Sequence, residues 1–303
     1  MASGLQPALT LSAPGHFLVQ PRLFIDTQHG LCNRLRALSS AVPVARATGR
    51  RLVVVWRPDH HCQARLSDLL AYTGPVIEDD AADLMRQRAA RVYNYMEIEE
   101  GACYREPILD GAQPIDGDIY VRAADMLAGP FSNDPAAYRF LARQQPSDAV
   151  LDLVRSVPRP SDVAVHIRMG TGPDFDHLSY ESPANWPAAR HRELADWRRK
   201  SDVSRFVARL DALIAEGSAS TIFAAADLQA AYAVLEERYG PRLRVLRRDL
   251  FDRSAAQLQY ALADLMLLTT APRFLASTWS SFSDVAQWLA RPGRLHERSG
   301  IDF

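Results

Sequence analysis

The chain has 303 residues, more than one hydrophobic core usually holds, and suits two domains of about 150 residues each. Hydrophobic residues make up 48% and charged residues 23%, a globular composition that argues against a disordered chain. The formal net charge of -1 argues against a general nucleic-acid binder and against a polybasic protein that works on a membrane surface.

The cysteines Cys32, Cys62 and Cys103 are an odd and sparse set, which does not make a disulfide framework. We expect free thiols in a reducing compartment, and therefore a cytoplasmic protein. No apolar run approaches the roughly 20 residues that a membrane helix needs, so no membrane span is expected. Residues 1–20 contain no basic region followed by a continuous apolar core, so we expect no signal peptide.

The N-terminal half begins with a βαβ pattern. Residues 23–26 predict a strand, the apolar spacing over 31–45 predicts a helix that ends at Gly49, and the β-branched run 52–56 predicts a buried parallel strand. The stretch 93–116 has no clear period. Further elements are expected as short strands at 76–77 and 119–121, a helix over 81–91, and one or two helices over 135–157 broken near Pro146.

Two prolines in the segment 157–162 disfavour a helix and favour an extended linker. We place the domain boundary there, which gives an N-terminal lobe of residues 1–157 and a C-terminal lobe of residues 158–303. Strands and helices alternate again after the boundary, and a long polar loop covers 169–197. The expected elements are strands at 163–167, 221–225, 243–246 and 273–276, and helices at 204–216, 228–239, 255–268 and 281–289.

Alternation of this kind predicts an α/β protein whose lobes are parallel, doubly wound and Rossmann-like, with a ligand cleft between them. Polar segments should carry the chemistry where they follow an apolar strand, because that edge of an open α/β sheet faces ligands. Four such segments occur, at 30–36, 166–170, 223–227 and 277–283.

In the first segment, Gly30 permits a close backbone approach and Asn33 offers both donors and an acceptor. Arg34 and Arg36 stand near a helix N-terminus, where a cation gains nothing from the dipole, so they suggest an anion site. The alternative is that Asn33 caps the helix and the arginines are solvated.

In the second segment, strand alternation places His166 and Arg168 on the same side of the chain. An arginine at the end of a strand can bind a phosphate through two parallel hydrogen bonds, although a structural ion pair remains possible. In the third segment, Asp227 can accept hydrogen bonds from a ribose or a base, or can cap the helix expected from Leu228.

The fourth segment, Ser277-Thr278-Trp279-Ser280-Ser281-Phe282-Ser283, is the most distinctive. Backbone N–H groups and hydroxyls at a helix N-terminus form an anion site. A serine-rich cap is the alternative, and hydroxyls placed around an aromatic directly after a buried strand make it the weaker one.

Taken in this order, the segments resemble the fucosyltransferase superfamily, which includes the α1,2-, α1,6- and protein O-fucosyltransferases and the rhizobial nodulation fucosyltransferase. The resemblance spans about residues 22–290. It implies a GT-B fold of two Rossmann-like lobes, inverting transfer of fucose from GDP-fucose, and no metal or other cofactor. Lobe 1–157 would be the acceptor side and lobe 158–303 would bind the nucleotide sugar, with a glycan, lipid or protein as the acceptor.

The resemblance also implies roles for individual residues. Gly30 and Asn33 match the family's G-x-x-N turn, which lies near the sugar and the acceptor. His166 and Arg168 match its H-x-R signature, in which the arginine contacts the β-phosphate of the donor. Asn33, His166 and Arg168 are therefore the candidate catalytic residues, and Gly30 and Arg168 are candidate donor-binding residues.

Further donor-binding residues follow from the same match. Asp227 corresponds to the acid after the second strand of the donor lobe, and Ser280, Ser281 and Phe282 correspond to the loop that closes around the phosphates and base. Asp264 corresponds to an acid in the preceding helix; its sequence context alone indicates a surface position on an amphipathic helix.

The sequence departs from the family pattern at two positions. Met169 stands where the α1,6 enzymes have a second arginine, and Leu228 stands where many members have a second aspartate. These departures affect the choice of fucose over another sugar more than the binding of a nucleotide diphosphate.

The sequence favours a site without a metal ion. The acidic pairs Asp116/Asp118 and Asp174/Asp176 resemble those of metal-dependent transferases, but both lie in loops where solvated acids are common. The run from His60 to Cys62 has no partner pair at zinc spacing and favours a structural or substrate-side role.

Two other classes of protein share this type of fold. A dinucleotide oxidoreductase would require a G-x-G-x-x-G turn, and the first strand is followed by Gly30 without the second glycine. A non-catalytic glycan- or nucleotide-binding module of the same fold remains the alternative function.

The acceptor and the general base stay open. His166 and Asp26 are candidates for the base by placement alone. The aromatic residues of the loop 169–197 suit stacking against sugars, and an unstructured lid is an equal alternative. They include His177, Tyr180, Trp186 and His191.

Overall fold

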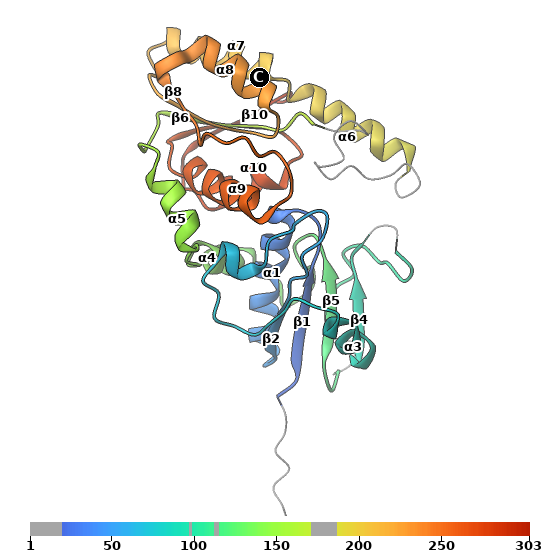
Figure 1. Cartoon of the computed structure of the whole chain (residues 1–303). Coiled ribbons are helices and arrows are strands. Elements are labelled where there is room, and N and C mark those ends of the chain that lie inside the picture. Colours follow the sequence, from blue (N-terminus) through green and yellow to red (C-terminus); the bar gives the residue numbers. More distant parts are fainter. Residues whose placement is uncertain (1–19, 97–98, 112–114, 171–186) are drawn as a thin grey trace, which may run out of the picture.

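The computed structural model describes residues 20–96, 99–111, 115–170 and 187–303. Within these ranges the chain forms two lobes stacked one above the other, each built around a five-stranded parallel sheet (Figure 1). Asp174, Asp176, His177, Tyr180 and Trp186 lie outside the described residues. The predicted α/β architecture of two Rossmann-like lobes is confirmed.

The N-terminal sheet has the strand order β3-β2-β1-β5-β4. Its central strands are rich in buried aliphatic residues, as parallel strands covered on both faces require. The strands are β1 (Arg22–Thr27), β2 (Arg51–Val55), β3 (Val76–Ile77), β4 (Arg91–Asn94) and β5 (Ile119–Ala123). Strand β4 is a correction, because its residues were expected to fall partly in a helix and partly in an irregular stretch.

The helices of this half follow the predicted pattern except for the short helix α2, which was not predicted. Gly49 follows the first helix with a φ of +64°, as expected of a glycine at a helix end. The break near Pro146 separates two short helices. The helices are α1 (Leu31–Ala47), α2 (Leu66–Leu69), α3 (Ala81–Arg88), α4 (Asp134–Ala142) and α5 (Asp148–Arg155).

The C-terminal sheet has the order β10-β9-β6-β7-β8, the doubly wound order of a Rossmann half. Its strands are β6 (Val163–Ile167), β7 (Ile222–Ala226), β8 (Leu243–Arg244), β9 (Arg273–Ala276) and β10 (Leu295–Arg298). Edge strand β10 was not predicted. The helices are α6 (Ala188–Lys200), α7 (Val203–Ala215), α8 (Gln229–Tyr239), the 3₁₀ turn η2 (Gly240–Arg242), α9 (Ala255–Leu268) and α10 (Ser281–Trp288).

Helix α6 corrects the prediction of a continuous loop over 169–197. None of its residues is buried, so the helix carries no apolar stripe that a sequence pattern could reveal. In Figure 1 it extends to one side of the C-terminal lobe.

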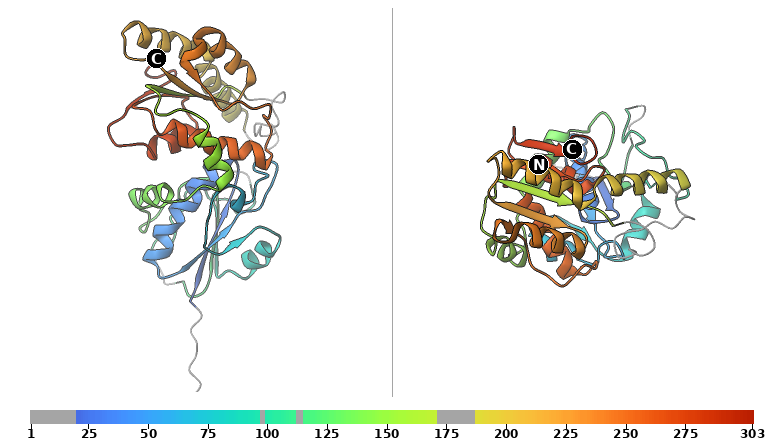
Figure 2. Two further views of the ribbon diagram at one scale, coloured as in Figure 1. Left: turned by 60° about the vertical axis from the view of Figure 1, so that its left-hand side comes forward. Right: turned by 90° about the horizontal axis from the view of Figure 1, so that it is seen from above.

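The two lobes are joined by helices that pack across their boundary. Helices α9 and α10 lie between the two sheets (Figure 2), where α1 packs against α10 and α5 packs against α9. One buried apolar cluster includes Leu35 of α1 together with Leu262 and Val285 from the second lobe. The domain boundary between residues 157 and 158 stays a prediction.

The predicted free thiols are confirmed, with Cys32 and Cys62 buried and Cys103 exposed. Over the described ranges, we find no helix with the length and apolar character to cross a membrane.

Candidate functional site

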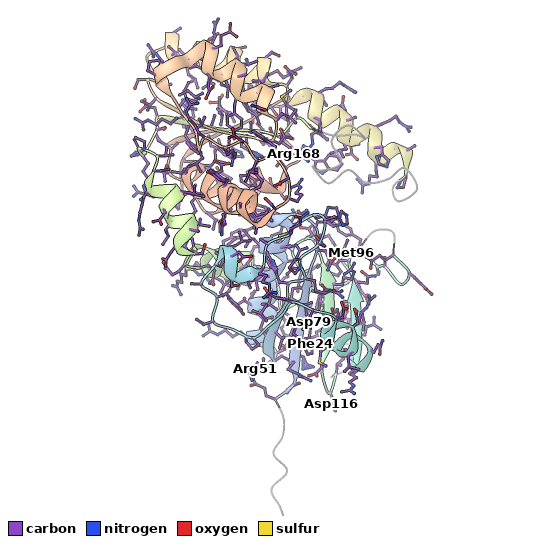
Figure 3. The ribbon with its side chains drawn as sticks, viewed as in Figure 1. Phe24, Arg51, Asp79, Met96, Asp116 and Arg168 are labelled. Atoms are coloured by element: carbon purple, nitrogen blue, oxygen red, sulfur yellow. The ribbon has the colours of Figure 1, made fainter. Side chains whose placement is uncertain are left out.

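A cavity of about 850 Å³ opens between the lobes and is lined by residues of both. Figure 3 labels Met96 in the N-terminal lobe and Arg168 in the C-terminal lobe, and both line this cavity. The structure brings every predicted site residue to the same walls. These residues are Gly30, Asn33, His166, Arg168, Asp227, Asp264, Ser280, Ser281 and Phe282.

Sheet topology explains why three of the predicted segments meet. Strand β6 lies between β9 and β7, so the chain turns from the carboxyl ends of these neighbouring strands into the same space. After β6 the chain builds β7 and β8 on one side of it and then crosses over to build β9 and β10 on the other side. The ends of β6 and β9 are therefore the topological switch point, where ligands bind in open α/β sheets. Arg168 follows β6, Asp227 follows β7 and Ser280 follows β9.

Arg168 is held in place on both its backbone and its side chain. Its backbone N–H donates to Ser277 Oγ at 2.8 Å, and its guanidinium donates to the carbonyl of Gly170 at 2.8 Å. The guanidinium also forms an ion pair with Asp227. The side chain keeps 19% of its surface exposed, so the cation is fixed yet open to the cavity.

Asp227 is not a helix cap, because Leu228 is the N-cap of α8 and makes no side-chain cap bond. Its carboxylate instead accepts hydrogen bonds from the backbone N–H groups of Met169 and Gly170, besides its pair with Arg168. Burial raises the pKa of Asp227, but the charge of Arg168 and these N–H groups outweigh it and lower the pKa overall. Asp227 is thus an anion that orients the turn after β6.

His166 links β6 to the start of α10. Its ring stacks on Phe282 with centroids 4.6 Å apart, and Nδ1 lies 2.8 Å from Ser283 Oγ. Burial lowers the pKa of His166 to about 3, with smaller contributions from neighbouring charges. The imidazole is therefore neutral at pH 7 and a weak base.

The loop before α10 presents the helix N-terminus to the cavity. Ser280 is the N-cap and its side chain makes no cap bond, and we find no side-chain acceptor for the first-turn N–H groups in the part of the chain that the structure describes. Trp279 has a φ of +54°, a strained conformation for a non-glycine residue, and its side chain also lines the cavity. The geometry is that of an anion site at a helix N-terminus.

Asp264 is buried on α9 and forms an ion pair of 2.5 Å with Arg248, so its prediction as a surface residue from sequence context alone is wrong. Helix α9 packs between the lobes, which buries residues on several of its faces. Burial raises the pKa of Asp264 to about 6 even though Arg248 opposes the shift. Within the described chain, Asp264 Oδ1 and Arg248 Nε and Nη1 have no hydrogen-bond partner.

On the N-terminal wall, the interpretation of Asn33 as a cap is wrong, because Gly30 is the N-cap of α1. A Cβ built at Gly30 would meet nothing within 4 Å, so the glycine leaves open space at the cavity wall. Arg34 is fully buried and pairs with Asp59 at 2.7 Å, which makes it a structural cation, not a solvated or anion-binding one.

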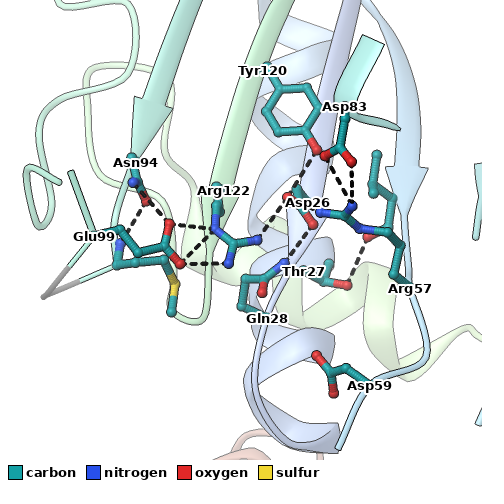
Figure 4. Close-up of polar contacts among 12 residues, drawn as sticks. Asp26, Thr27, Gln28, Arg57, Asp59, Asp83, Asn94, Glu99, Tyr120 and Arg122 are labelled. Carbon is teal, nitrogen blue, oxygen red and sulfur yellow. Dashed lines mark hydrogen bonds and ion pairs between the residues drawn. The ribbon is translucent and has the colours of Figure 1, made fainter. Parts of the chain in front are cut away.

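Beneath this wall a buried polar network surrounds Asp26 (Figure 4). Its carboxylate accepts hydrogen bonds from Tyr120 Oη at 2.9 Å, Gln28 Nε2 at 2.6 Å and Arg122 Nη1 at 3.2 Å. Asp26 does not line the cavity, whereas Arg122 and its partner Glu99 do. Asp26 therefore holds the cavity residue Arg122 in place without facing the cavity itself.

Sequence reasoning missed several cavity residues. Arg248 follows strand β8, so the strand-end rule could have found it. Arg198 lies on the unpredicted helix α6, and Arg253 lies in the loop before α9; neither carried a sequence signal. His60 and His61 line the cavity, with ring centroids 3.8 Å apart and the rings tilted by 41°. The substrate-side role considered for them stays a prediction.

The possible metal ligands do not gather in the described part of the chain, where no group of three His, Cys, Asp or Glu side chains could hold an ion. Asp118 instead accepts hydrogen bonds from the backbone and guanidinium of Arg22 at 2.8 and 3.0 Å.

Comparison with family models finds no match, and no curated protein matches the chain. Solved structures do match. A NodZ α-1,6-fucosyltransferase soaked with GDP-fucose has a TM-score of 0.56 at 15% identity, covering 90% of this chain and 93% of that one. A fucosyltransferase NodZ from Bradyrhizobium has a TM-score of 0.54 at 15% identity, covering 90% of this chain and 94% of that one.

POFUT1 in complex with GDP-fucose has a TM-score of 0.53 at 12% identity, covering 95% of this chain and all of that one (100%). The chain thus has the GT-B-type fold of these glycosyltransferases, with two Rossmann-like lobes around a shared cavity. The resemblance found in the sequence to the fucosyltransferase superfamily is confirmed at the level of the fold.

Proposed function

We propose that this chain is an inverting glycosyltransferase that takes fucose from GDP-fucose and passes it to a glycan-type acceptor without a metal ion. The observation that carries the proposal is one interlobe cavity that holds Arg168, the N-terminus of α10 and the buried pair Asp264–Arg248. Arg168 and the N-terminus of α10 suit the diphosphate of a guanosine diphosphate sugar, and the Asp264–Arg248 pair suits its base.

The diphosphate would bind where Arg168 and the first turn of α10 converge. Breaking the bond between the anomeric carbon and the β-phosphate oxygen leaves the electron pair on the nucleotide, whose negative charge grows in the transition state. In the absence of a metal, preorganised cations and N–H groups must stabilise that charge. Arg168 is preorganised for this task by Asp227 and by the carbonyl of Gly170.

The base would bind at Asp264 and Arg248. Guanine presents two neighbouring N–H donors on one edge and the acceptors O6 and N7 on another. Asp264 Oδ1 offers an unpaired acceptor and Arg248 offers unpaired Nε and Nη1 donors within the described chain. Uracil and adenine lack the two adjacent N–H donors, so this pair favours GDP over UDP or ADP.

The acceptor oxygen would attack the anomeric carbon from the face opposite the leaving diphosphate, which inverts the centre, and its proton would leave to solvent or to a weak base. His166 is a poor base because its pKa is lowered to about 3 by burial. In this proposal His166 positions the start of α10 through Phe282 and Ser283. Asn33, whose side chain makes no hydrogen bond to any residue described, is available to the sugar or acceptor.

The N-terminal wall suits a neutral acceptor. Arg36 pairs with Asp125 at 3.3 Å and Arg122 pairs with Glu99 at 2.6 Å, so these cavity arginines are neutralised by carboxylates. Alternating donors and acceptors without net charge match sugar hydroxyl groups. The nearby ring of Tyr104 adds an apolar face of the kind that stacks on sugars.

Binding of GDP is expected to raise the melting temperature of the protein more than binding of UDP or ADP. At a nucleotide concentration 100 times the Kd, the native state gains about 2.7 kcal/mol, which corresponds to a rise on the order of 5 °C for a chain of this size. Differential scanning fluorimetry with the three nucleotides, and with inorganic diphosphate as the control, checks this. Equal or greater stabilisation by UDP would remove the guanine assignment.

A further inference from the structure

Arg198, on helix α6, is a cavity cation for which the described residues supply no carboxylate partner. It lines the cavity beside Arg168, but forms no ion pair with any carboxylate that the structure describes. Its Nε is buried without a hydrogen-bond partner in the described chain. Among the described residues, its two terminal nitrogens reach only the carbonyl of Trp279, at 3.4 and 3.5 Å, which is too long for strong bonds.

The electrostatic setting of Arg198 is unfavourable without a ligand. Burial and then the positive charge of Arg168 lower the pKa of Arg198 to about 9, and the negative charge of Asp227 only partly opposes this. Most other arginines near the cavity are neutralised: Arg36 by Asp125, Arg122 by Glu99 and Arg248 by Asp264. A guanidinium whose Nε is buried and that is held next to a second cation gains most from an anion that reaches both.

The position of Arg198 indicates which anion this is. Trp279, whose carbonyl the guanidinium approaches, immediately precedes the N-cap Ser280 of α10. Arg198 therefore lies next to the N-terminus of α10 that faces the cavity, close enough to Arg168 for the two charges to interact. Two guanidinium groups and a helix N-terminus around one point match an anion with more than one negative charge.

We propose that Arg198 is a second diphosphate-binding residue, which contacts the donor together with Arg168 and is supplied by helix α6. This inference rests on the proposed function, since it assigns one more residue to the same donor. The chain lacks an arginine directly after Arg168, where Met169 packs its side chain against the apolar cluster of the C-terminal lobe. A cation from a different element thus fills the cavity next to Arg168.

Isothermal titration with GDP, GMP and guanosine tests the inference on Arg198→Gln and on the matched control Arg199→Gln. Arg199 is the next residue of α6, is exposed and pairs with Asp196. Loss of a charge-assisted contact should weaken GDP binding by Arg198→Gln about 10- to 100-fold and leave guanosine binding within about twofold. Arg199→Gln should bind all three ligands like the unaltered protein, and Arg198→Lys should recover part of the loss.

Three results would overturn the inference. GDP binding by Arg198→Gln that equals that of the unaltered protein removes Arg198 from the diphosphate site and leaves the proposed function standing. An equal loss of affinity for GDP and guanosine, with a lower melting temperature, would show a structural role. Failure of the unaltered protein to bind GDP would instead refute the proposed function itself, and the assignment of Arg198 with it.

Discussion

Replacement of Arg168 by lysine is expected to lower the rate of GDP-fucose turnover by about 10²- to 10³-fold, which is about 3–4 kcal/mol of transition-state stabilisation. Lysine keeps a positive charge beside Asp227 but loses the planar guanidinium that can hold a carbonyl and a phosphate oxygen at once. The melting temperature without ligand should change little. Steady-state kinetics and calorimetry on the same preparation measure both quantities.

Arg168→Ala should lose as much activity and also some stability. Asp227 would keep its hydrogen bonds from Met169 and Gly170 but lose its cation, at a cost of about 2 kcal/mol. Arg209→Lys is the matched control, because Arg209 pairs with Glu297 in the same lobe and does not line the cavity. Near-normal turnover by the Arg168→Lys protein would remove Arg168 from the mechanism, whereas a drop in melting temperature with turnover preserved would make it a structural ion pair.

The affinity for GDP-fucose is expected to rise about tenfold between pH 5 and pH 7, because the donor requires the ionised form of Asp264. The pKa of this carboxyl is raised by burial from 3.8 to about 6 in the free protein. GDP-fucose suits the measurement, since its diphosphate has no terminal phosphate group that titrates near neutral pH. Titration calorimetry of the unaltered protein over this range needs no variant.

The contribution of Asp264 to the stability of the free protein should follow the opposite trend over an overlapping, slightly lower pH range. A folded-state pKa raised above the unfolded value means that the folded state holds more protons between about pH 4 and pH 6. The contribution of Asp264 to stability therefore falls as the pH rises through this range, while donor affinity increases. If the protein binds GDP-fucose with an affinity that does not depend on pH, the guanine base binds away from Asp264.

Arg248→Met combined with Asp264→Asn removes both buried charges together. Removing only one would leave the other unpaired in the interior, which typically costs about 3–5 kcal/mol. The double variant should fold, lose the pH dependence of binding and discriminate less between GDP and ADP. Glu297→Gln provides a control for loss of a partly buried carboxylate outside the cavity.

The sequence predicted the C-terminal wall of the cavity for a physical reason. Arg168, Asp227 and Ser280 each follow an apolar strand, and parallel strands end at a common edge of the sheet, so strand patterns alone bring these residues together. Strand-end reasoning could also have located Arg248 after β8. Strand-end reasoning could not predict the burial of Asp264, because that burial depends on the packing of α9 between the two lobes and not on the sequence pattern of the helix.

Other features depend on contacts that no local pattern records. The carboxylate of Asp227 is bound by the turn after β6, not by its own helix. Arg198 was missed because α6 buries none of its residues and so lacks a hydrophobic period. Edge strand β10 is mostly exposed, which removes the apolar run that marked the central strands.

Release of GDP from GDP-fucose by the purified protein, in the presence of EDTA, tests the central claim most directly. With water as a poor acceptor, we predict slow turnover that is proportional to protein, changes less than about twofold on adding EDTA, and falls to background in the Arg168→Lys variant. Binding of GDP-fucose without any release above background would contradict the account and identify a non-catalytic nucleotide-sugar-binding module. Activity that EDTA abolishes and manganese restores would contradict the metal-free mechanism.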